Sequence, residues 1–373
     1  MRLTINKEQF LKALNNASHA VATKTPMPLL TNLKLELNEK GLEVTGSNNE
    51  ITIKATVPYM IGEKEIIRNA GIGSILVNAH ILTEVIRHLE GAELSFEVID
   101  DAIAKIDDGK SSFKLNCLKA EEYPDIDLEP SGIAFDMKCA DFQRLIEQSA
   151  FAASVKEQRP ILTGLNLRAA DGVLVATATD SARLARKQIT IDSDVKFACN
   201  IPARVCLDIV HLFENTVDVS ISISDKKALF DFDSTIVTSR LIPGDYPVTD
   251  AIIPQTFNFF LQANSQELLS AMERVRILSG DNEPVVKLSM REDEVEVSAK
   301  SDATQSAVEK ISTFQFNGEF LDVSFNSQFV IDAVKAVKSD DVSICFIGEM
   351  KPFVVKNPKD ASVIELITPM RTF

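Results

Sequence analysis

The feature that most constrains this chain is one pattern that occurs three times along its 373 residues. Each copy has two short segments in which apolar and polar residues alternate, with a polar turn between them. The apolar members are Leu35, Leu37, Leu42 and Val44; Leu165, Leu167, Val173 and Val175; and Leu288, Met290, Val295 and Val297. Because alternate side chains of a strand point to the same face, each copy predicts a hairpin with one buried face.

Segments with helical spacing lie on both sides of each hairpin. Upstream segments begin near Phe10, Phe142 and Leu268, where Asn6, Asp141 and Ser265 are candidate caps. Downstream segments begin at Ile81, Val205 and Phe329, which are 124 residues apart both times. So long a period is typical of a triplicated domain and not of a solenoid. We therefore predict an α+β chain of three domains, each with two helices packed on antiparallel sheets, at residues 1–129, 130–254 and 255–373.

Composition restricts the compartment. The chain has no apolar run of about 18 residues, and its N-terminus lacks the apolar core of a signal peptide. The five cysteines are scattered and form no C-x-x-C pair, which indicates buried thiols in a reducing environment. These features predict a cytoplasmic protein.

A search for chemical motifs finds no catalytic constellation. The four histidines have no metal-ligand spacing, and the common nucleophile and phosphate-loop motifs are missing. Gly71-Ile72-Gly73 is interpreted as a plain turn, and Asp107-Asp108-Gly109 suits a hairpin turn better than a calcium loop. Ser181 has no suitable histidine partner. The sequence therefore predicts no enzyme, no catalytic residue, no metal and no cofactor.

Several short segments resemble one family. They are Thr179-Asp180-Ser181-Ala182-Arg183-Leu184-Ala185, Pro243-Gly244-Asp245-Tyr246-Pro247, Thr368-Pro369-Met370-Arg371, Pro26-Met27-Pro28-Leu29-Leu30 and Ala120-Glu121-Glu122-Tyr123-Pro124. In order and spacing they are similar to the bacterial sliding clamps, the beta subunits of DNA polymerase III, along the whole chain. The resemblance implies a head-to-tail homodimer that closes into a ring, with helices lining the hole and strands forming the outer shell.

The resemblance also implies a function in DNA replication. A sliding clamp is a processivity factor that encircles double-stranded DNA without sequence preference and tethers the polymerase to it. The implied partners are the DNA polymerase III catalytic subunit, the clamp loader, other proteins with clamp-binding motifs, and a second copy. Two alternatives stay open, an enzyme of unknown type and a scaffold that acts without DNA.

The formal net charge of -15 argues against nucleic-acid binding, because phosphate binding is driven by Lys and Arg. The six predicted helices are nevertheless near neutral, so the excess acid falls on strands and loops. Those helices span residues 6–23, 78–91, 139–159, 202–215, 264–283 and 326–341. A less negative hole inside an acidic shell would admit DNA loosely. Ordinary solvated helices remain the alternative explanation.

The resemblance assigns residues to three sites. The implied DNA contacts are Lys24, Lys156, Arg159 and Arg204, of which Lys24 replaces a family arginine. The implied pocket for partner peptides comprises Ile161, Leu162, Thr179, Ser181, Arg183, Leu184, Pro247, Ile252, Asn326, Phe329, Pro352, Leu366, Thr368, Pro369, Met370 and Arg371. Arg183 and Arg371 are expected to steer acidic flanks of the peptide. The alternative for the apolar members is that they are simply core.

The implied dimer interface pairs Phe113 and Leu115 of one subunit with Ile277 and Leu278 of the other. The family has an acidic cluster near this edge, whereas Ala303-Thr304-Gln305-Ser306 contains no acid here. We therefore expect a smaller ionic contribution to dimerisation than in the rest of the family.

Overall fold

The computed structural model describes residues 1–373 except 23–24, 214–215, 280–283, 301–304 and 372–373. Contacts divide the chain into two compact units. The first unit combines Met1–Cys139 with Asp208–Leu241, and the second combines Ala140–Leu207 with Ile242–Phe373.

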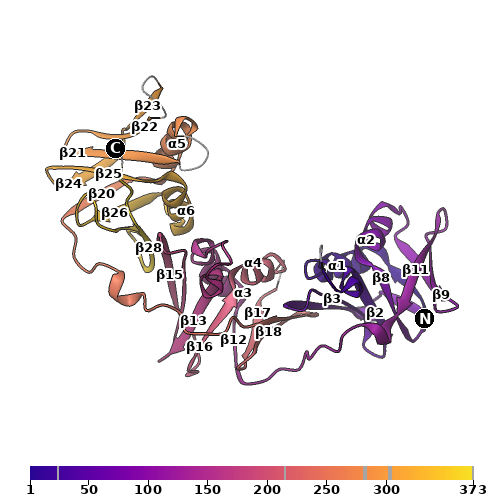
Figure 1. Cartoon of the computed structure of the whole chain (residues 1–373). Coiled ribbons are helices and arrows are strands. Elements are labelled where there is room, and N and C mark those ends of the chain that lie inside the picture. The colour runs from indigo at the N-terminus through magenta and orange to yellow at the C-terminus, as the bar shows by residue number, and fades with distance from the viewer. Residues whose placement is uncertain (23–24, 214–215, 280–283, 301–304, 372–373) are drawn as a thin grey trace. The chain divides into compact units, whose positions relative to one another are not determined.

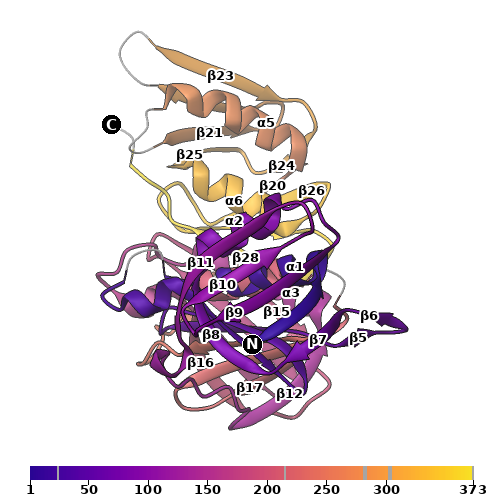
Figure 2. The same cartoon turned by 90° about the vertical axis from the view of Figure 1, so that its right-hand side faces the viewer.

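The first unit is built on one sheet of 13 strands, in the order β12-β17-β18-β19-β4-β3-β2-β8-β11-β10-β9-β1-β7. Helices α1 (Lys7–Ser18) and α2 (Ala79–His88) lie side by side against it (Figure 1). The short hairpin of β5 (Met60–Ile61) and β6 (Lys64–Glu65) extends away from it (Figure 2). The strands of the large sheet are β1 (Arg2–Asn6), β2 (Asn32–Asn38), β3 (Gly41–Ser47), β4 (Ile51–Val57), β7 (Ile67–Gly71), β8 (Gly73–Asn78), β9 (Glu93–Ile99), β10 (Ile103–Asp107), β11 (Ser112–Lys119), β12 (Ile133–Lys138), β17 (Asp218–Ile223), β18 (Lys227–Phe232) and β19 (Thr235–Arg240).

The second unit contains a nine-stranded sheet, β16-β13-β14-β15-β28-β27-β26-β20-β24, and a four-stranded sheet, β23-β22-β21-β25. Its helices are α3 (Cys139–Glu147), α5 (Ser265–Val275) and α6 (Ser327–Val337), with the short helices η3 (Ala150–Ala152), η4 (Pro160–Thr163), η5 (Asp250–Ile252) and η6 (Arg276–Leu278). Helix α4 (Ala203–His211) is divided between the two units after Leu207. The strands are β13 (Gly164–Ala170), β14 (Val173–Thr179), β15 (Arg183–Thr190), β16 (Phe197–Pro202), β20 (Phe259–Asn264), β21 (Val285–Arg291), β22 (Val295–Lys300), β23 (Ser306–Ile311), β24 (Phe314–Asn317), β25 (Phe320–Asn326), β26 (Asp341–Phe346), β27 (Phe353–Asn357) and β28 (Asp360–Ile367).

The three predicted hairpins are confirmed. They are β2–β3, β13–β14 and β21–β22, and each pairs antiparallel around the predicted polar turn. In the first copy Leu35 lies opposite Val44, and in the third Leu288 lies opposite Val297. These side chains are fully buried, because the alternating pattern places them on the face that the helices cover.

The six predicted helices are also found, although several are shorter than expected. Asn6 caps α1 as predicted, since its Oδ1 accepts the backbone N–H of Gln9 at 3.1 Å. The prediction for α5 was wrong by one residue: Asn264 is the cap, and Ser265 is already helical. Helix α3 ends at Glu147 and not near residue 159, because Ser149 leaves the helical conformation with φ -140°. Its hydroxyl instead donates to the carbonyl of Leu145 at 2.6 Å.

Within each unit, a strand from one predicted domain joins the sheet of the preceding domain. In the first unit β19 pairs with β4 through residues 235–239 and 51–55. In the second unit β28 pairs with β15 through residues 363–367 and 183–187. In the repeat, β4 and β15 are each the strand after the hairpin, and β19 and β28 are each the last strand of a domain. The same joint is therefore built twice along the chain.

Two further expectations concern the cysteines and the turn at Asp107-Asp108-Gly109. All five cysteines are buried and free, as predicted. Burial raises the pKa of Cys199 to about 12 and that of Cys139 to about 11, so both are protonated thiols at neutral pH. The Asp-Gly segment forms the predicted turn between β10 and β11, where Asp108 accepts four backbone N–H groups. No helix in the described part of the chain combines the length and apolar character needed to cross a membrane.

Candidate functional site

The loop between β14 and β15 holds part of one segment that resembles the family, residues 179–185. Asp180 Oδ1 accepts the backbone N–H groups of Ala182 at 2.9 Å and Arg183 at 3.0 Å. Ser181 adopts a positive φ of 80°, which lets the chain turn within three residues and leaves its side chain exposed. The Thr179 hydroxyl closes the loop by donating to the carbonyl of Arg183 at 2.5 Å. The loop is thus fixed by its own side chains.

The side chain of Arg183 turns inward from this loop. Its Nε donates to Asp180 at 3.1 Å, its Nη1 to Asp332 of α6 at 2.7 Å, and its Nη2 to the carbonyl of Phe151 at 2.9 Å. The guanidinium carbon lies 4.6 Å from the ring centroid of Phe329 and 5.5 Å from that of Phe151. Only 14% of the side chain is exposed. Arg183 therefore connects the loop to η3 and to α6.

The C-terminal segment that follows β28 is fastened beside the same loop. The backbone N–H of Thr368 donates to the carbonyl of Ala182 at 2.9 Å, and that of Met370 donates to the carbonyl of Ser324 at 2.7 Å. Pro369 is buried, Met370 is half-buried, and Thr368 and Arg371 are exposed. The segment thus places a partly accessible apolar side chain, Met370, and an exposed cation, Arg371, next to the loop.

The predicted apolar pocket residues differ in burial. Leu184 and Leu366 lie opposite each other in the β15–β28 pairing and belong to a buried cluster with Ile253 and Val354. Leu162 is also buried, whereas Ile161 is half-buried and Ile252 is 51% exposed. The buried leucines thus form structure beneath the surface, and Ile252 lies in solvent.

The other predicted pocket residues lie on segments that side chains of the second unit hold in place. Tyr246, next to Pro247, accepts the backbone N–H of Thr179 at 3.0 Å, and burial raises the pKa of this phenol to about 12. Asn326 caps α6 by accepting the N–H of Gln328 at 2.9 Å, one turn before Phe329. Hydrogen bonds and ring contacts therefore bring together the β14–β15 loop, the Tyr246 segment, α6 and the C-terminal segment.

Pro352 lies just before β27, whose Phe353 pairs with Ile367, and Ile161 lies in η4.

The residues assigned to DNA contact occupy different elements. Lys24 lies outside the described residues. Lys156 and Arg159 are both exposed on the segment between η3 and η4, whereas Arg204 is exposed in the first turn of α4. These three described cations present charge on the helical and loop surfaces of the second unit.

The residues assigned to the dimer interface are largely accessible. Phe113 on β11 is 40% exposed and Ile277 on η6 is 78% exposed, while Leu115 and Leu278 are half-buried. Of the segment that lacks acid, residues 303–304 lie outside the described part of the chain, and Gln305 and Ser306 are exposed. Each place therefore exposes one large apolar side chain, Phe113 or Ile277, beside a half-buried leucine.

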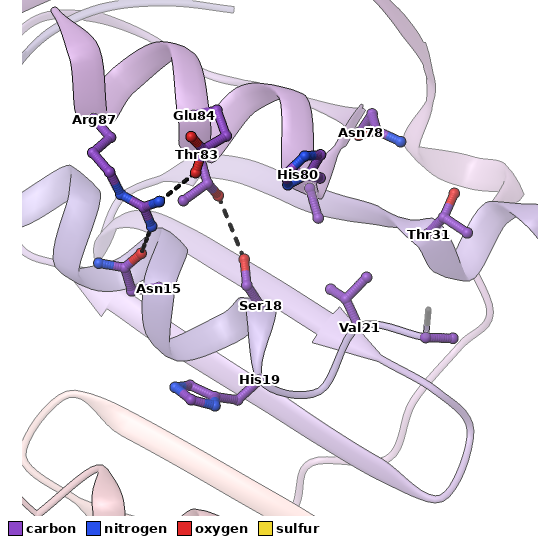
Figure 3. A pocket seen from close by; sticks show the side chains of 12 residues that line it. Asn15, Ser18, His19, Val21, Thr31, Asn78, His80, Thr83, Glu84 and Arg87 are labelled. Atoms are coloured by element: carbon purple, nitrogen blue, oxygen red, sulfur yellow. Dashed lines mark hydrogen bonds and ion pairs between the residues drawn. The ribbon is translucent and has the colours of Figure 1, made fainter. Parts of the chain in front are cut away.

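A cavity of about 950 Å³ in the first unit was not singled out from the sequence. Figure 3 shows its walls, with His80, Thr83 and Arg87 of α2 on one side and Asn15 and Ser18 of α1 on the other. Arg87 bonds to Glu84 and, at 3.3 Å, to Asn15, so its charge is largely matched. The cavity lies between the polar faces of the amphipathic helices α1 and α2. The helical spacing of their polar residues is the sequence signal that could have indicated these two faces. Among the described residues, no three His, Cys, Asp or Glu side chains lie close enough to hold a metal ion.

Comparison with known proteins identifies the family. Residues 1–127, 136–248 and 250–371 match the N-terminal, central and C-terminal domains of the DNA polymerase III beta subunit. The beta sliding clamp of Bacillus subtilis (strain 168) is 33% identical, with 100% of both chains covered. The crystal structure of the Bacillus subtilis DNA polymerase sliding clamp superposes with a TM-score of 0.95 at 32% identity, with 100% of each chain covered. That of the DNA polymerase III beta chain from Streptococcus pneumoniae TIGR4 gives 0.94 at 32% identity, again with 100% of each chain covered. Three matching domain models in order, and relatives whose whole length is covered, establish that the chain belongs to the family of DNA polymerase III beta subunits, the beta sliding clamps.

Proposed function

We propose that two copies of this chain close head to tail into a ring around duplex DNA. The ring tethers polymerases and other partners through the pocket between the β14–β15 loop, α6 and the C-terminal segment. In this proposal the chain is a non-catalytic processivity factor of DNA replication. Its three domains meet near residues 129–130 and 254–255. Membership of the beta sliding clamp family supports the clamp role, and the arrangement of the strands supports the ring.

The observation that carries the ring is the repeated joint. The strand after the hairpin in one domain pairs with the last strand of the next domain, as β4 does with β19 and β15 with β28. The same rule leaves β23 and β11 without such partners in the described part of the chain. Strand β23 is an edge of its sheet (Figure 2), and residues 112–116 of β11 pair with β10 alone. A free edge strand is a template for pairing with another chain, so a second copy supplies the missing partner for each.

Exposed apolar residues support the same edge. Phe113 is on the free part of β11, and Ile277 follows α5, which packs against β23. Two such joints related by a two-fold axis would bury Phe113 and Ile277 and would pair both β23 and the free part of β11. A closed ring is therefore consistent with what each edge strand requires.

The distribution of charge supports DNA in the hole. The six α-helices together contain seven Lys and Arg and eight Asp and Glu residues, a net charge of -1, whereas the whole chain carries -15. Helices that line the hole would therefore repel phosphates little, and exposed Lys156, Arg159 and Arg204 would supply contacts without base specificity. Retention would come from topology and only slightly from affinity.

The decisive experiment separates topological from electrostatic retention. A labelled clamp is loaded onto a nicked plasmid by a clamp loader, and the complex is passed through a sizing column in rising salt. We expect co-elution with circular DNA at salt that abolishes direct binding to linear duplex, and release after the plasmid is cut once. Protein that stays bound after linearisation would show that the ring mechanism does not apply.

A matched control uses the proposed dimer edge. Ile277→Asp with Leu278→Asp should give a folded monomer that no longer co-elutes with the plasmid, because like charges replace an apolar contact. Sedimentation velocity measures the mass, and circular dichroism checks folding. An unchanged dimer would place the interface elsewhere.

The pocket is tested separately from the ring. Met370→Ala with Arg371→Ala should leave loading on circular DNA intact but reduce stimulation of a polymerase, since a few anchor contacts dominate short-peptide binding. If polymerase peptides bind this variant with unchanged affinity, the C-terminal segment is not part of the partner site.

A further inference from the structure

The charged groups around Arg183 do not suit a residue that binds an acidic peptide directly. Arg183 lies between the carboxylates of Asp180 and Asp332, and each of its three guanidinium nitrogens donates to a group of the protein. One cation and two carboxylates give this Arg183 cluster a net charge of -1. An acidic peptide flank would meet a site that is already negative, and only 14% of the Arg183 side chain is exposed.

The same contacts suit a residue that positions others. The cluster joins three segments that are far apart in sequence: the β14–β15 loop through Asp180, η3 through the carbonyl of Phe151, and α6 through Asp332. The flat guanidinium also packs against the ring of Phe329, a proposed pocket residue. A planar fork with several fixed donors orients partners in a way that a lysine ammonium does not.

The position of Asp332 extends this connection along α6. Its second oxygen accepts Gln328 Nε2 at 2.6 Å, and the amide oxygen of Gln328 accepts Arg276 at the start of η6. Both carboxylate oxygens of Asp332 are therefore engaged within the second unit. This row of hydrogen bonds joins the side of α6 that carries Gln328 and Asp332 to the β14–β15 loop and to η6, and Phe329 follows Gln328 directly.

We propose that Arg183 is a positioning residue of the partner pocket, which sets the orientation of the β14–β15 loop and of Phe329 and does not bind the charge of the partner. This inference rests on the proposed function of the pocket. It changes the role expected for Arg183 from the sequence and leaves exposed Arg371 as the residue that reads acidic flanks.

The test uses two fluorescent synthetic nonapeptides with the same C-terminal Leu-Phe anchors. One carries two Asp residues before the anchors, and the other carries two Asn residues. Fluorescence anisotropy measures the dissociation constant of each peptide for the full chain and for the variants Arg183→Lys and Asp332→Asn. A change in the ratio of the two dissociation constants shows that the residue recognises the charge of the peptide. An equal loss of affinity for both peptides shows that it positions the pocket.

If Arg183 positions the pocket, both variants weaken both peptides by about tenfold, a loss of about 1.4 kcal/mol, and Arg183→Lys, which keeps the charge, leaves the ratio unchanged. Asp332→Asn separates the two roles by sign. Removal of a carboxylate would strengthen the acidic peptide if Arg183 read charge, whereas loss of the Arg183–Asp332 contact weakens both peptides if it positions. A stronger acidic peptide with Asp332→Asn, or an unchanged affinity with Arg183→Lys, would overturn the inference.

Two controls keep the outcomes distinct. The first is Arg291→Lys. Arg291 also packs on an aromatic ring, 4.7 Å from the centroid of Phe320, but it lies outside the proposed pocket. This variant should bind both peptides with unchanged affinity. Thermal unfolding identifies any variant that does not fold, and Asp332→Asn carries the test if Arg183→Lys fails. If the unmodified chain binds neither peptide, the proposed pocket itself is wrong and not the role of Arg183.

Discussion

The two joints of this chain share a topology but differ in chemistry. Both are five-residue antiparallel pairings between the last strand of one domain and the strand after the hairpin of the domain before it. At the β4–β19 joint the buried polar residues are neutral hydroxyls such as Thr52, Thr235 and Ser239. At the β15–β28 joint the buried ones include the ionisable Lys187 and Glu365, and the half-buried Arg183 lies beside them. A strand pairing is therefore enough to join two domains, and the charged groups must have a further use.

The difference coincides with the proposed pocket. The charges of the β15–β28 joint reach loops and helices beside it, because Arg183 contacts η3 and α6 and Lys187 contacts Asp360 and Ser362. The hydroxyls of the β4–β19 joint make short local bonds, such as that between Ser47 and Thr52 at 2.8 Å. We infer that the second joint has been adapted to hold a surface in place, whereas the first mainly joins two domains.

The largest effect is expected at Arg183. Arg183→Met should lower the stability of the β15–β28 joint by about 3 kcal/mol, because two carboxylates would lose their partly buried partner. Thr52→Val at the other joint should cost about 1 kcal/mol, the usual value for one neutral hydrogen bond. Amide hydrogen exchange on β15 and on β4 measures each joint separately, since strands open locally with their own free energies. Equal losses would remove the contrast between the joints.

A smaller contrast is expected between two lysines. Lys187 is 7% exposed and donates to Asp360 at 2.9 Å and Ser362 at 2.6 Å, whereas Lys54 is 19% exposed and lies 3.4 Å from Glu43. Lys187→Met should therefore cost about 2 kcal/mol and Lys54→Met at most about 0.5 kcal/mol. The shift in thermal midpoint of each variant measures the difference. If Lys54→Met lost more stability than Lys187→Met, the charged residues would matter more at the β4–β19 joint, contrary to the contrast drawn above.

The buried carboxyl of Glu365 provides a test that depends on pH. Burial raises its pKa well above 4.5, although the nearby charge of Arg183 opposes this. In the folded chain the Glu365 carboxyl holds a proton that it releases when the chain unfolds above pH 4.5. Its contribution to stability is therefore complete below pH 4.5 and declines as the pH rises. Glu365→Gln should therefore leave stability unchanged near pH 4 and raise it at pH 8. Thermal midpoints that stay parallel between pH 4 and 8 would contradict a protonated Glu365.

The smallest effect concerns two aspartates with low pKa values. Backbone N–H groups of Ser111, Lys110 and Gly91 lower the pKa of Asp108 to about 2. Burial opposes ionisation of Asp360, but hydrogen bonds from Ser362 and Lys187 outweigh it and also lower its pKa to about 2. In each case stability is present above pH 3.8 and is lost as the pH falls toward 2. Lys187→Met should raise the pKa of Asp360 alone, which NMR titration of the carboxyl carbons would measure.

Much of the fold could be predicted from the sequence because it depends on local periodicity. Residues such as Leu35 and Val44 alternate within seven-residue strands, and helix α5 follows the spacing of Leu268 and Met272. Side-chain burial follows directly from such spacing, so hairpins, helices and their repetition were all visible. The exact ends were not, as Ser149 just beyond α3 and Asn264 at the start of α5 demonstrate, since single side-chain bonds decide them.

What the sequence determined by itself was the threefold α+β repeat, the lack of a catalytic motif and, through short ordered segments, the family. The tertiary structure alone decided the direction of Arg183, which pairs with Asp332 across 149 residues of sequence. It also decided that Leu184 and Leu366 are buried while Ile252 is exposed. The physical reason is that periodicity reports which face of an element is apolar. The partner of a charged side chain depends on which elements the packed sheets bring together.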